Sequence, residues 1–207
     1  MGTNLPSKIR RRHACGLTGD SSSIVRDVQK SANRTLTWEE AEEWQRDNPY
    51  IRDGYRPVTA SFPELLRSMM ILHNETCNVY THFIGAASLP FLALPYIQLL
   101  SDTRFAAVTK ADYFMFGLFF GTAECCLIIS TLYHLYMSHS RRAEQFWLRM
   151  DLLGIITVTE GTHISGINYI FPCEPYWQRV YWASVSGLNR PIVLATEWSS
   201  AYVDPRS

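Results

Sequence analysis

The stretch from Thr76 to Ser101 contains no Asp, Glu, Lys or Arg, and this feature constrains the fold most. A helix of about 20 apolar residues is enough to cross a lipid bilayer. Charged residues are concentrated before this stretch, because residues 1–78 carry 11 of the 19 basic and 10 of the 19 acidic residues. The sequence of 207 residues therefore indicates a polar N-terminal region followed by membrane-spanning segments, rather than a single soluble domain.

The overall composition excludes several other classes of protein. The formal net charge is +0 and no basic stripe with interleaved aromatic residues occurs, which argues against a nucleic-acid partner. The five cysteines form no Cys-x-x-Cys pair, and their number is odd, so we expect no disulfide framework. The first 36 residues hold no continuous apolar core, so we expect the later spans to direct membrane insertion.

The region before the first span divides into two parts. Residues 1–36 are polar and lack periodicity, so we expect a disordered cytoplasmic tail. Residues 37–78 form an amphipathic juxtamembrane segment, in which Thr37 and Glu40 have the spacing of a helix capping box. The capping box predicts a short helix at this point. Trp38 and Trp44 favour docking of this helix on the membrane surface, and a solvated helix is the alternative.

Three transmembrane spans are predicted within residues 79–172, at 79–100, 113–136 and 152–171. The third is marginal alone, because it carries Glu160, His163 and several hydroxyl side chains, and we expect it to need protein neighbours. The fold class is therefore all-α integral membrane. The segment Asn189-Arg190-Pro191 interrupts the following apolar pattern, so residues 173–207 are predicted to be an irregular tail.

The basic residues around the spans predict the orientation. The loop 137–150 holds Arg141, Arg142 and Arg149, and the N-terminal region is also rich in arginine, whereas the loop 101–112 holds only Arg104 and Lys110. Positive residues accumulate on the cytoplasmic side, so the N-terminus is predicted to be cytoplasmic. This bias does not distinguish the plasma membrane from an internal membrane.

A candidate site lies where the second span ends and the third begins. Ser130 and His134 are four residues apart, which places them on one face of a helix, and Asp151 is expected at a similar membrane depth. An imidazole, a hydroxyl and a carboxylate could bind a transition metal and orient a metal-bound water. The alternative is that Ser130 and His134 face water while Asp151 caps the third helix. Before the first span, Glu75 and Asn78 could cap a helix or bond across to the third span.

Three ordered motifs resemble the progestin and adipoQ receptor family, which includes adiponectin receptors, fungal zinc-homeostasis membrane proteins and haemolysin III relatives. The motifs are Leu66-Arg67-Ser68 through His73-Asn74-Glu75-Thr76 to His82, then Ser130-Thr131-Leu132-Tyr133-His134 with Ser138-His139-Ser140, and Met150-Asp151-Leu152-Leu153-Gly154-Ile155. The resemblance covers about Trp38 to Val185. The segment Trp38 to Pro57 is similar to the fungal branch.

The resemblance implies a seven-helix, receptor-like protein with roles in lipid signalling and in zinc and sterol homeostasis. It also implies a zinc ion bound by His134, with Ser130 and Asp151 contacting the metal through water, and a ceramide- or sterol-like lipid as ligand. The implied activity is hydrolysis of a ceramide-type amide, for which zinc would lower the pKa of a bound water to about 7.

One departure from the family pattern bears on activity. Family members supply two more zinc ligands from a His-x-x-x-His pair on the seventh helix, and no histidine follows Val185 here. Catalytic zinc sites keep about three protein ligands. We therefore expect that the chain as written is not a competent zinc hydrolase. We also expect residues 186–207 to be an aberrant tail produced by premature termination. The alternatives are a non-catalytic three-span protein that pairs with a full-length relative and, with less sequence support, a pore.

Overall fold

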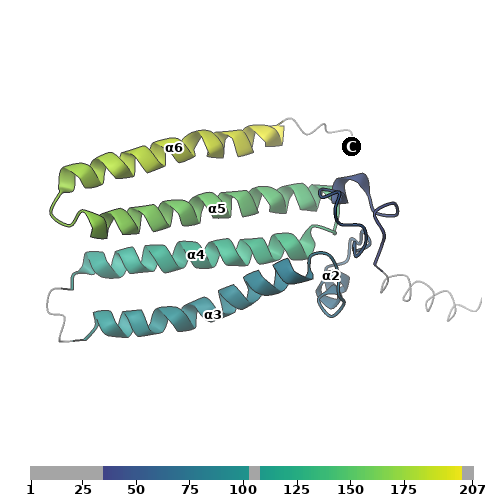
Figure 1. Ribbon diagram of the computed structural model, residues 1–207, viewed down its shortest axis with the longest axis horizontal. Helices are drawn as coiled ribbons and strands as arrows, with labels where there is room; N and C mark the ends of the chain where they lie inside the picture. The colour runs from purple at the N-terminus through teal and green to yellow at the C-terminus, as the bar shows by residue number, and fades with distance from the viewer. Residues whose placement is uncertain (1–34, 103–107, 202–207) are drawn as a thin grey trace, which may run out of the picture. The chain divides into compact units, whose positions relative to one another are not determined.

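The computed structural model describes residues 35–102 and 108–201, with side chains through residue 189 (Figure 1). Nearly all of the predicted tail, residues 1–36, lies outside this part. The elements in chain order are a short 3-10 helix η1 and five α-helices: η1 Glu43–Gln45, α2 Phe62–Ser68, α3 Thr76–Leu100, α4 Lys110–Tyr136, α5 Arg141–Ile170 and α6 Pro175–Ala201. The described residues form no strand beyond one isolated bridge between Leu36 and Tyr55. The predicted all-α fold is therefore confirmed.

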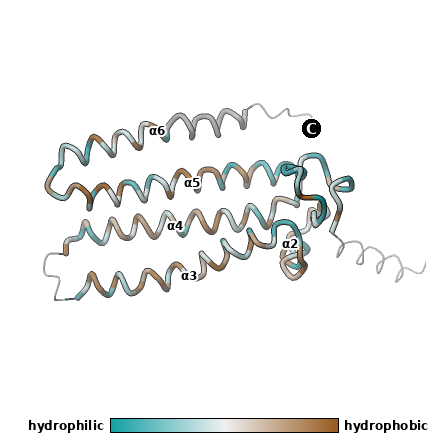
Figure 2. The backbone as a smooth tube through the Cα atoms, viewed as in Figure 1, coloured by the Kyte–Doolittle hydropathy of each residue, from teal (hydrophilic) through white to brown (hydrophobic). Residues whose placement is uncertain are grey.

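The four long helices pack in the order of the chain, with α3 on α4, α4 on α5 and α5 on α6 (Figure 1). Within the described residues, two helices are long and apolar enough to cross a membrane, α3 and α4 (Figure 2). They contain the predicted spans 79–100 and 113–136 and begin three residues before them. Pro90 and Pro95 lie inside α3 without ending it. Many large apolar side chains of α3 are exposed, Phe91 by 73%, as expected for a helix that faces lipid.

Helix α5 begins eleven residues before the predicted third span, at Arg141 rather than Leu152. The reason is a local cap: Ala143 N donates to Ser140 Oγ at 3.2 Å, which starts the helix directly after α4. Asp151 is therefore in the interior of α5, and its alternative role as an N-cap is wrong. α5 is long enough to cross a bilayer but less apolar than α3 and α4.

The predicted irregular tail, residues 173–207, is corrected by α6, which runs from Pro175 to Ala201. Its first turns are held against α5 by side-chain hydrogen bonds. Gln178 Nε2 donates to Asn168 O and to Phe171 O, and Trp182 Nε1 donates to Ile164 O at 3.1 Å. The helix continues through Pro191, where local sequence preference predicts a break.

Helices α4 and α5 approach closely at two glycines. A Cβ atom on Gly154 would lie 3.4 Å from Cys126 Cα, and one on Gly161 would lie 2.2 Å from Thr122 Oγ1. These two pairs fix the antiparallel register of the helices. The register brings Asp151 close to the level of Ser130.

The juxtamembrane segment, residues 37–78, does not form the helix predicted from Thr37. Half of the predicted capping box is present, since Thr37 N donates to Glu40 Oε2 at 3.0 Å. The backbone N–H groups nevertheless form hydrogen bonds outside any helix, because Leu36 N donates to Tyr55 O and Trp38 N donates to Arg52 O. Only a 3-10 turn follows, over Glu43–Gln45.

Candidate functional site at the helix ends

A hydrogen bond between Glu75 and His134 joins the start of α3 to the end of α4. The distance from His134 Nδ1 to Glu75 Oε2 is 2.8 Å, and both side chains are largely buried, at 17% and 9% exposure. The two residues are 59 positions apart in the chain. This contact forms because Glu75 immediately precedes α3 while His134 lies in the last turn of α4.

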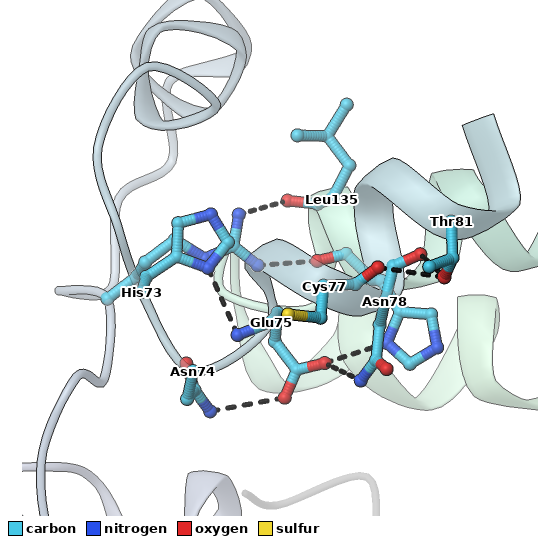
Figure 3. Close-up of polar contacts among 9 residues, drawn as sticks. His73, Asn74, Glu75, Cys77, Asn78, Thr81 and Leu135 are labelled. Atoms are coloured by element: carbon cyan, nitrogen blue, oxygen red, sulfur yellow. Dashed lines mark hydrogen bonds and ion pairs between the residues drawn. The ribbon is translucent and has the colours of Figure 1, made fainter. Parts of the chain in front are cut away.

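The Glu75 carboxylate has two further partners from its own end of α3 (Figure 3). Asn78 Nδ2 donates to Oε2 at 2.8 Å, and Asn74 Nδ2 donates to Oε1 at 3.1 Å. Burial raises the pKa of Glu75, but the hydrogen bonds with His134 and Asn78 outweigh burial, so the net pKa lies below its ordinary value. Glu75 is therefore ionised at neutral pH.

An ionised carboxylate can only accept hydrogen bonds, so the Nδ1 atom of His134 must carry the proton that is shared with Glu75. In the neutral imidazole this leaves a lone pair on Nε2. The His82 ring stacks nearly parallel to the His134 ring, with the centroids 5.5 Å apart. A carboxylate that fixes the tautomer and a neighbouring ring that limits rotation together orient His134.

Ser130 on α4 and Asp151 on α5 lie further from the helix ends than His134. Ser130 is one turn before His134 on α4 and is buried, with 5% exposure. Asp151, partly exposed on α5, is close enough to interact electrostatically with His82 and Cys126. The structure thus brings Ser130 and His134 onto one face of α4, while Asp151 approaches the level of Ser130. We call Glu75, Ser130, His134 and Asp151 the helix-end site.

The backbone of His134 is held from the juxtamembrane segment by Arg56. This buried guanidinium donates from Nη2 to His134 O, and from Nη1 to Leu135 O at 2.9 Å and to Ser68 Oγ at 3.2 Å. Burial lowers the pKa of Arg56 to about 10, against the opposing effect of Glu75, so the side chain stays charged at neutral pH. Arg56 caps α4, whose last carbonyls have no partner within the helix.

His73 completes the polar layer beneath α3. Its Nδ1 accepts a hydrogen bond from Glu75 N at 3.1 Å (Figure 3). Its backbone N donates to Thr76 Oγ1. Burial, together with the nearby positive charge of Arg56, lowers the pKa of His73 to about 4, although Glu75 acts in the opposite direction. His73 is therefore neutral at pH 7.

The donor set of this region does not by itself fit a zinc ion. Within residues 35–102 and 108–201, no three His, Cys, Asp or Glu side chains are grouped closely enough to hold a metal. His134 offers one free ring nitrogen, whereas catalytic zinc sites keep about three protein ligands. The described residues therefore provide at most one part of a zinc site.

Glu75 and Arg56 were not predicted from the sequence as partners of His134. The position of Glu75 predicted a helix cap or a bond to the third span, and in the structure its carboxylate bonds instead to the second span. Arg56 belongs to the Trp38 to Pro57 segment that is similar to the fungal branch, but that similarity assigned it no partner. Its role depends on a contact with residues 78 and 79 positions later in the chain, which no local pattern encodes.

These features define an all-helical membrane protein whose spans are joined at one end by a buried polar site. Comparison with known proteins specifies the class further. Residues 70–202 match the Haemolysin-III related family, and the match runs past Val185, where the sequence analysis placed the end of the resemblance. The chain belongs to this family.

Several related proteins carry receptor names. The chain is 35% identical to the ADIPOR-like receptor IZH2 of Saccharomyces cerevisiae over 77% of its own length and 50% of the relative. It is 33% identical to human progestin and adipoQ receptor family member 3, over 78% of the chain and 51% of the relative. It is 26% identical to the adiponectin receptor protein of Drosophila melanogaster, over 86% and 39%. The chain spans about half the length, or less, of these relatives. The expected resemblance to the progestin and adipoQ receptors is confirmed.

Proposed function

We propose that this chain is a receptor-like membrane protein of lipid signalling and of zinc and sterol homeostasis, and that the helix-end site is its functional centre. The observation that carries the proposal is the 2.8 Å hydrogen bond between Glu75 and His134. It holds an imidazole in one tautomer at the end of two apolar helices, with a free nitrogen available to a ligand. The receptor names of the fungal and animal relatives support the same role.

The ligand that we propose is a lipid with a polar head, ceramide- or sterol-like in chemistry. His134 Nε2 would accept a hydrogen bond from a hydroxyl or amide of the head group, and Ser130 and Asp151 offer further polar atoms one turn deeper. The exposed apolar side chains of α3 and α4 would contact the hydrocarbon part. The N-terminus and the helix-end site lie on the cytoplasmic side in this proposal, in accord with the arginine bias.

A zinc-dependent amide hydrolysis is not part of the proposal for this chain alone. His134 would be one zinc ligand, as the family resemblance implies, but the described residues supply no second and third ligand at the same place. A ceramidase-type activity would need those ligands from outside the described part of the chain.

Metal analysis of the purified chain first tests whether its zinc site is incomplete. The purified chain, dialysed against metal-free buffer, should retain far less than one zinc ion per chain. A near-stoichiometric zinc content that is lost in the His134→Ala variant would show that the chain completes a zinc site, and would overturn the proposed incomplete site.

Photo-crosslinking with a ceramide analogue tests the lipid ligand. The His134→Ala variant should lose most of the labelling, while His163→Ala should keep it, because His163 lies exposed on α5 and bonds to its own helix through Thr159 O. Equal labelling of both variants would contradict the assignment of the site.

A second candidate function is non-catalytic pairing of helices within the membrane. Thr157, Thr162 and His163 are exposed along α5, although polar side chains on membrane helices favour protein contacts over lipid. Pairing with a full-length relative would cover them. Co-purification with such a relative, abolished by replacing these three residues with Leu or Val but not by His134→Ala, would favour this function over the first.

A further inference from the structure

Four large apolar side chains are exposed on α2 and on the turn that follows it. Met70 is 87% exposed, Leu72 84%, Phe62 50% and Leu66 49%. Phe62 and Leu66 are four residues apart, which aligns them along one side of α2, and Met70 and Leu72 lie in the turn beyond its last residue, Ser68. We call these four residues the α2 stripe.

The opposite side of α2 faces the protein. Leu65 is 1% exposed, and Ser68 Oγ accepts a hydrogen bond from the buried Arg56. α2 therefore has one apolar side chain, Leu65, in the core, and two others, Phe62 and Leu66, uncovered. Its seven residues extend only about 10 Å, so it is much too short to cross a bilayer.

Two contacts place α2 at the level where both spans end. Tyr80, in the second turn of α3, donates from its hydroxyl to Met69 O at 3.0 Å. Phe62 packs edge-on against Tyr136, the last residue of α4, with ring centroids 5.2 Å apart. The start of α3 and the end of α4 mark one surface of the membrane that these helices cross, and α2 is tied to both (Figure 1).

The tryptophans that the sequence analysis expected at the membrane surface are less available. The Trp38 ring packs against Tyr55 and lies 5.9 Å from Arg46 Cζ and 5.8 Å from Arg52 Cζ. Trp44 is only partly exposed. The cluster of uncovered apolar side chains in this segment is therefore on α2 and the turn that follows it, not at the tryptophans.

We propose that the α2 stripe is a lipid-docking surface, inserted into the interfacial layer of the same bilayer that α3 and α4 cross. Burial of these side chains among the upper acyl chains removes apolar surface from water, and the proximity of two membrane spans means that no separate targeting step is needed. The docked stripe anchors the juxtamembrane segment, which in turn holds His134 through Arg56 and Glu75. This inference depends on the two spans and not on the ligand proposed for the helix-end site.

Spin-label accessibility on the full chain in phosphatidylcholine nanodiscs tests the proposal. The five native cysteines are replaced by Ala, and single labels are attached at Met70→Cys, at Leu72→Cys and, as a matched control, at Tyr50→Cys, which is 90% exposed in the same segment. Labels at positions 70 and 72 should collide with oxygen rather than with a water-soluble nickel chelate. Their ratio of oxygen to nickel collisions should exceed that at position 50 by about threefold or more, as expected for the headgroup and acyl boundary.

Hydroxyl-radical footprinting provides a second measurement on the unmodified chain, in case the cysteine-free variant does not fold. Met70 in nanodiscs should be oxidised several-fold more slowly than its intrinsic reactivity in the unfolded chain, while Tyr50 should react as a water-exposed side chain. A water-exposed signal at positions 70 and 72 would overturn the proposal. Labels accessible to neither collider would also overturn it, because that result means that protein, such as a second copy of this chain, covers the stripe.

Discussion

The helix ends and the helix bodies of this membrane protein use polar side chains in different ways. At the ends, Glu75, Arg56 and Gln45 bond to residues 59, 79 and 93 positions away in the chain. Along the bodies, most hydroxyls bond to a carbonyl of their own helix, as Thr131 does with Leu127 O. Tertiary hydrogen bonds along the bodies are fewer, such as the bond from Ser165 Oγ to Met115 O.

This difference indicates what specifies each region. In the bodies, small residues allow the helices to approach, and the outer side chains are exposed and apolar. At the ends, charged groups are buried together and each depends on its partners. Substitutions at the ends should therefore cost more stability than substitutions in the bodies, and the predictions below test that order.

The largest effect is expected for Arg56→Ala. This change removes three hydrogen bonds from a charged donor and leaves the carbonyls of His134 and Leu135 buried without it. Bonds to charged groups contribute about 1.5–3 kcal/mol each, and they are not additive, so we expect a loss of about 4 kcal/mol in the free energy of unfolding. Denaturant titration in mixed micelles measures this loss.

The matched control is Arg52→Ala, since Arg52 is exposed and its guanidinium contacts the Trp38 ring. We expect a cost of about 0.5–1 kcal/mol for the control. Similar losses in the free energy of unfolding for the two variants would show that the buried cap on α4 contributes no more stability than an exposed arginine. That result would remove the contrast between the helix ends and the rest of the molecule.

The next effect is a dependence of stability on pH caused by His73. Its pKa is about 4 in the folded protein and ordinarily 6.5, so between these values the unfolded chain binds more protons than the folded one. Stability should therefore be unaffected by His73 above about pH 6.5 and should fall as the pH drops towards 4. The loss over this range is about 3 kcal/mol at most, because each pKa unit corresponds to 1.36 kcal/mol.

Unfolding midpoints measured from pH 7.5 to 4.5 test this prediction against the His73→Asn variant. The Asn side chain can place an oxygen where Nδ1 accepts from Glu75 N, but it does not titrate in this range. The variant should show a weaker pH dependence than the original chain. An unchanged pH profile would mean that another group causes the acid sensitivity.

How far the sequence predicts this molecule depends on the range of the interactions. The uncharged run from Thr76 and the apolar segment after Tyr113 identified the two spans, because hydropathy is a local property. The motif containing Ser130 and His134 placed both residues correctly on one helical face. The helix over residues 175–201 was not predictable in this way, because its first turns are held by contacts with α5 such as the bond from Trp182 to Ile164 O.

The partners of His134 also could not be found from spacing. Glu75 has the position of a helix cap, and only the packing of α3 against α4 turns its carboxylate towards His134. The capping box at Thr37 illustrates the opposite error. Its local hydrogen bond forms, yet the pairing of Leu36 with Tyr55 prevents the helix that it predicts. Local signals hold where no long-range contact competes with them.

The smallest of the three effects concerns the helix bodies, at the closest approach of α4 and α5. A methyl group added in Gly161→Ala would lie 2.2 Å from Thr122 Oγ1 and 2.9 Å from Thr122 Cβ. A rotation of the threonine side chain cannot move its Cβ, so the two helices must separate slightly, which costs about 2 kcal/mol. Gly166→Ala is the matched control on the same helix, because nothing lies within 4 Å of the new methyl group. The control should be neutral or slightly stabilising, since Ala favours a helix by about 1 kcal/mol relative to Gly. If Gly161→Ala instead proves as costly as Arg56→Ala, close packing of the helix bodies is as important for stability as the buried polar ends.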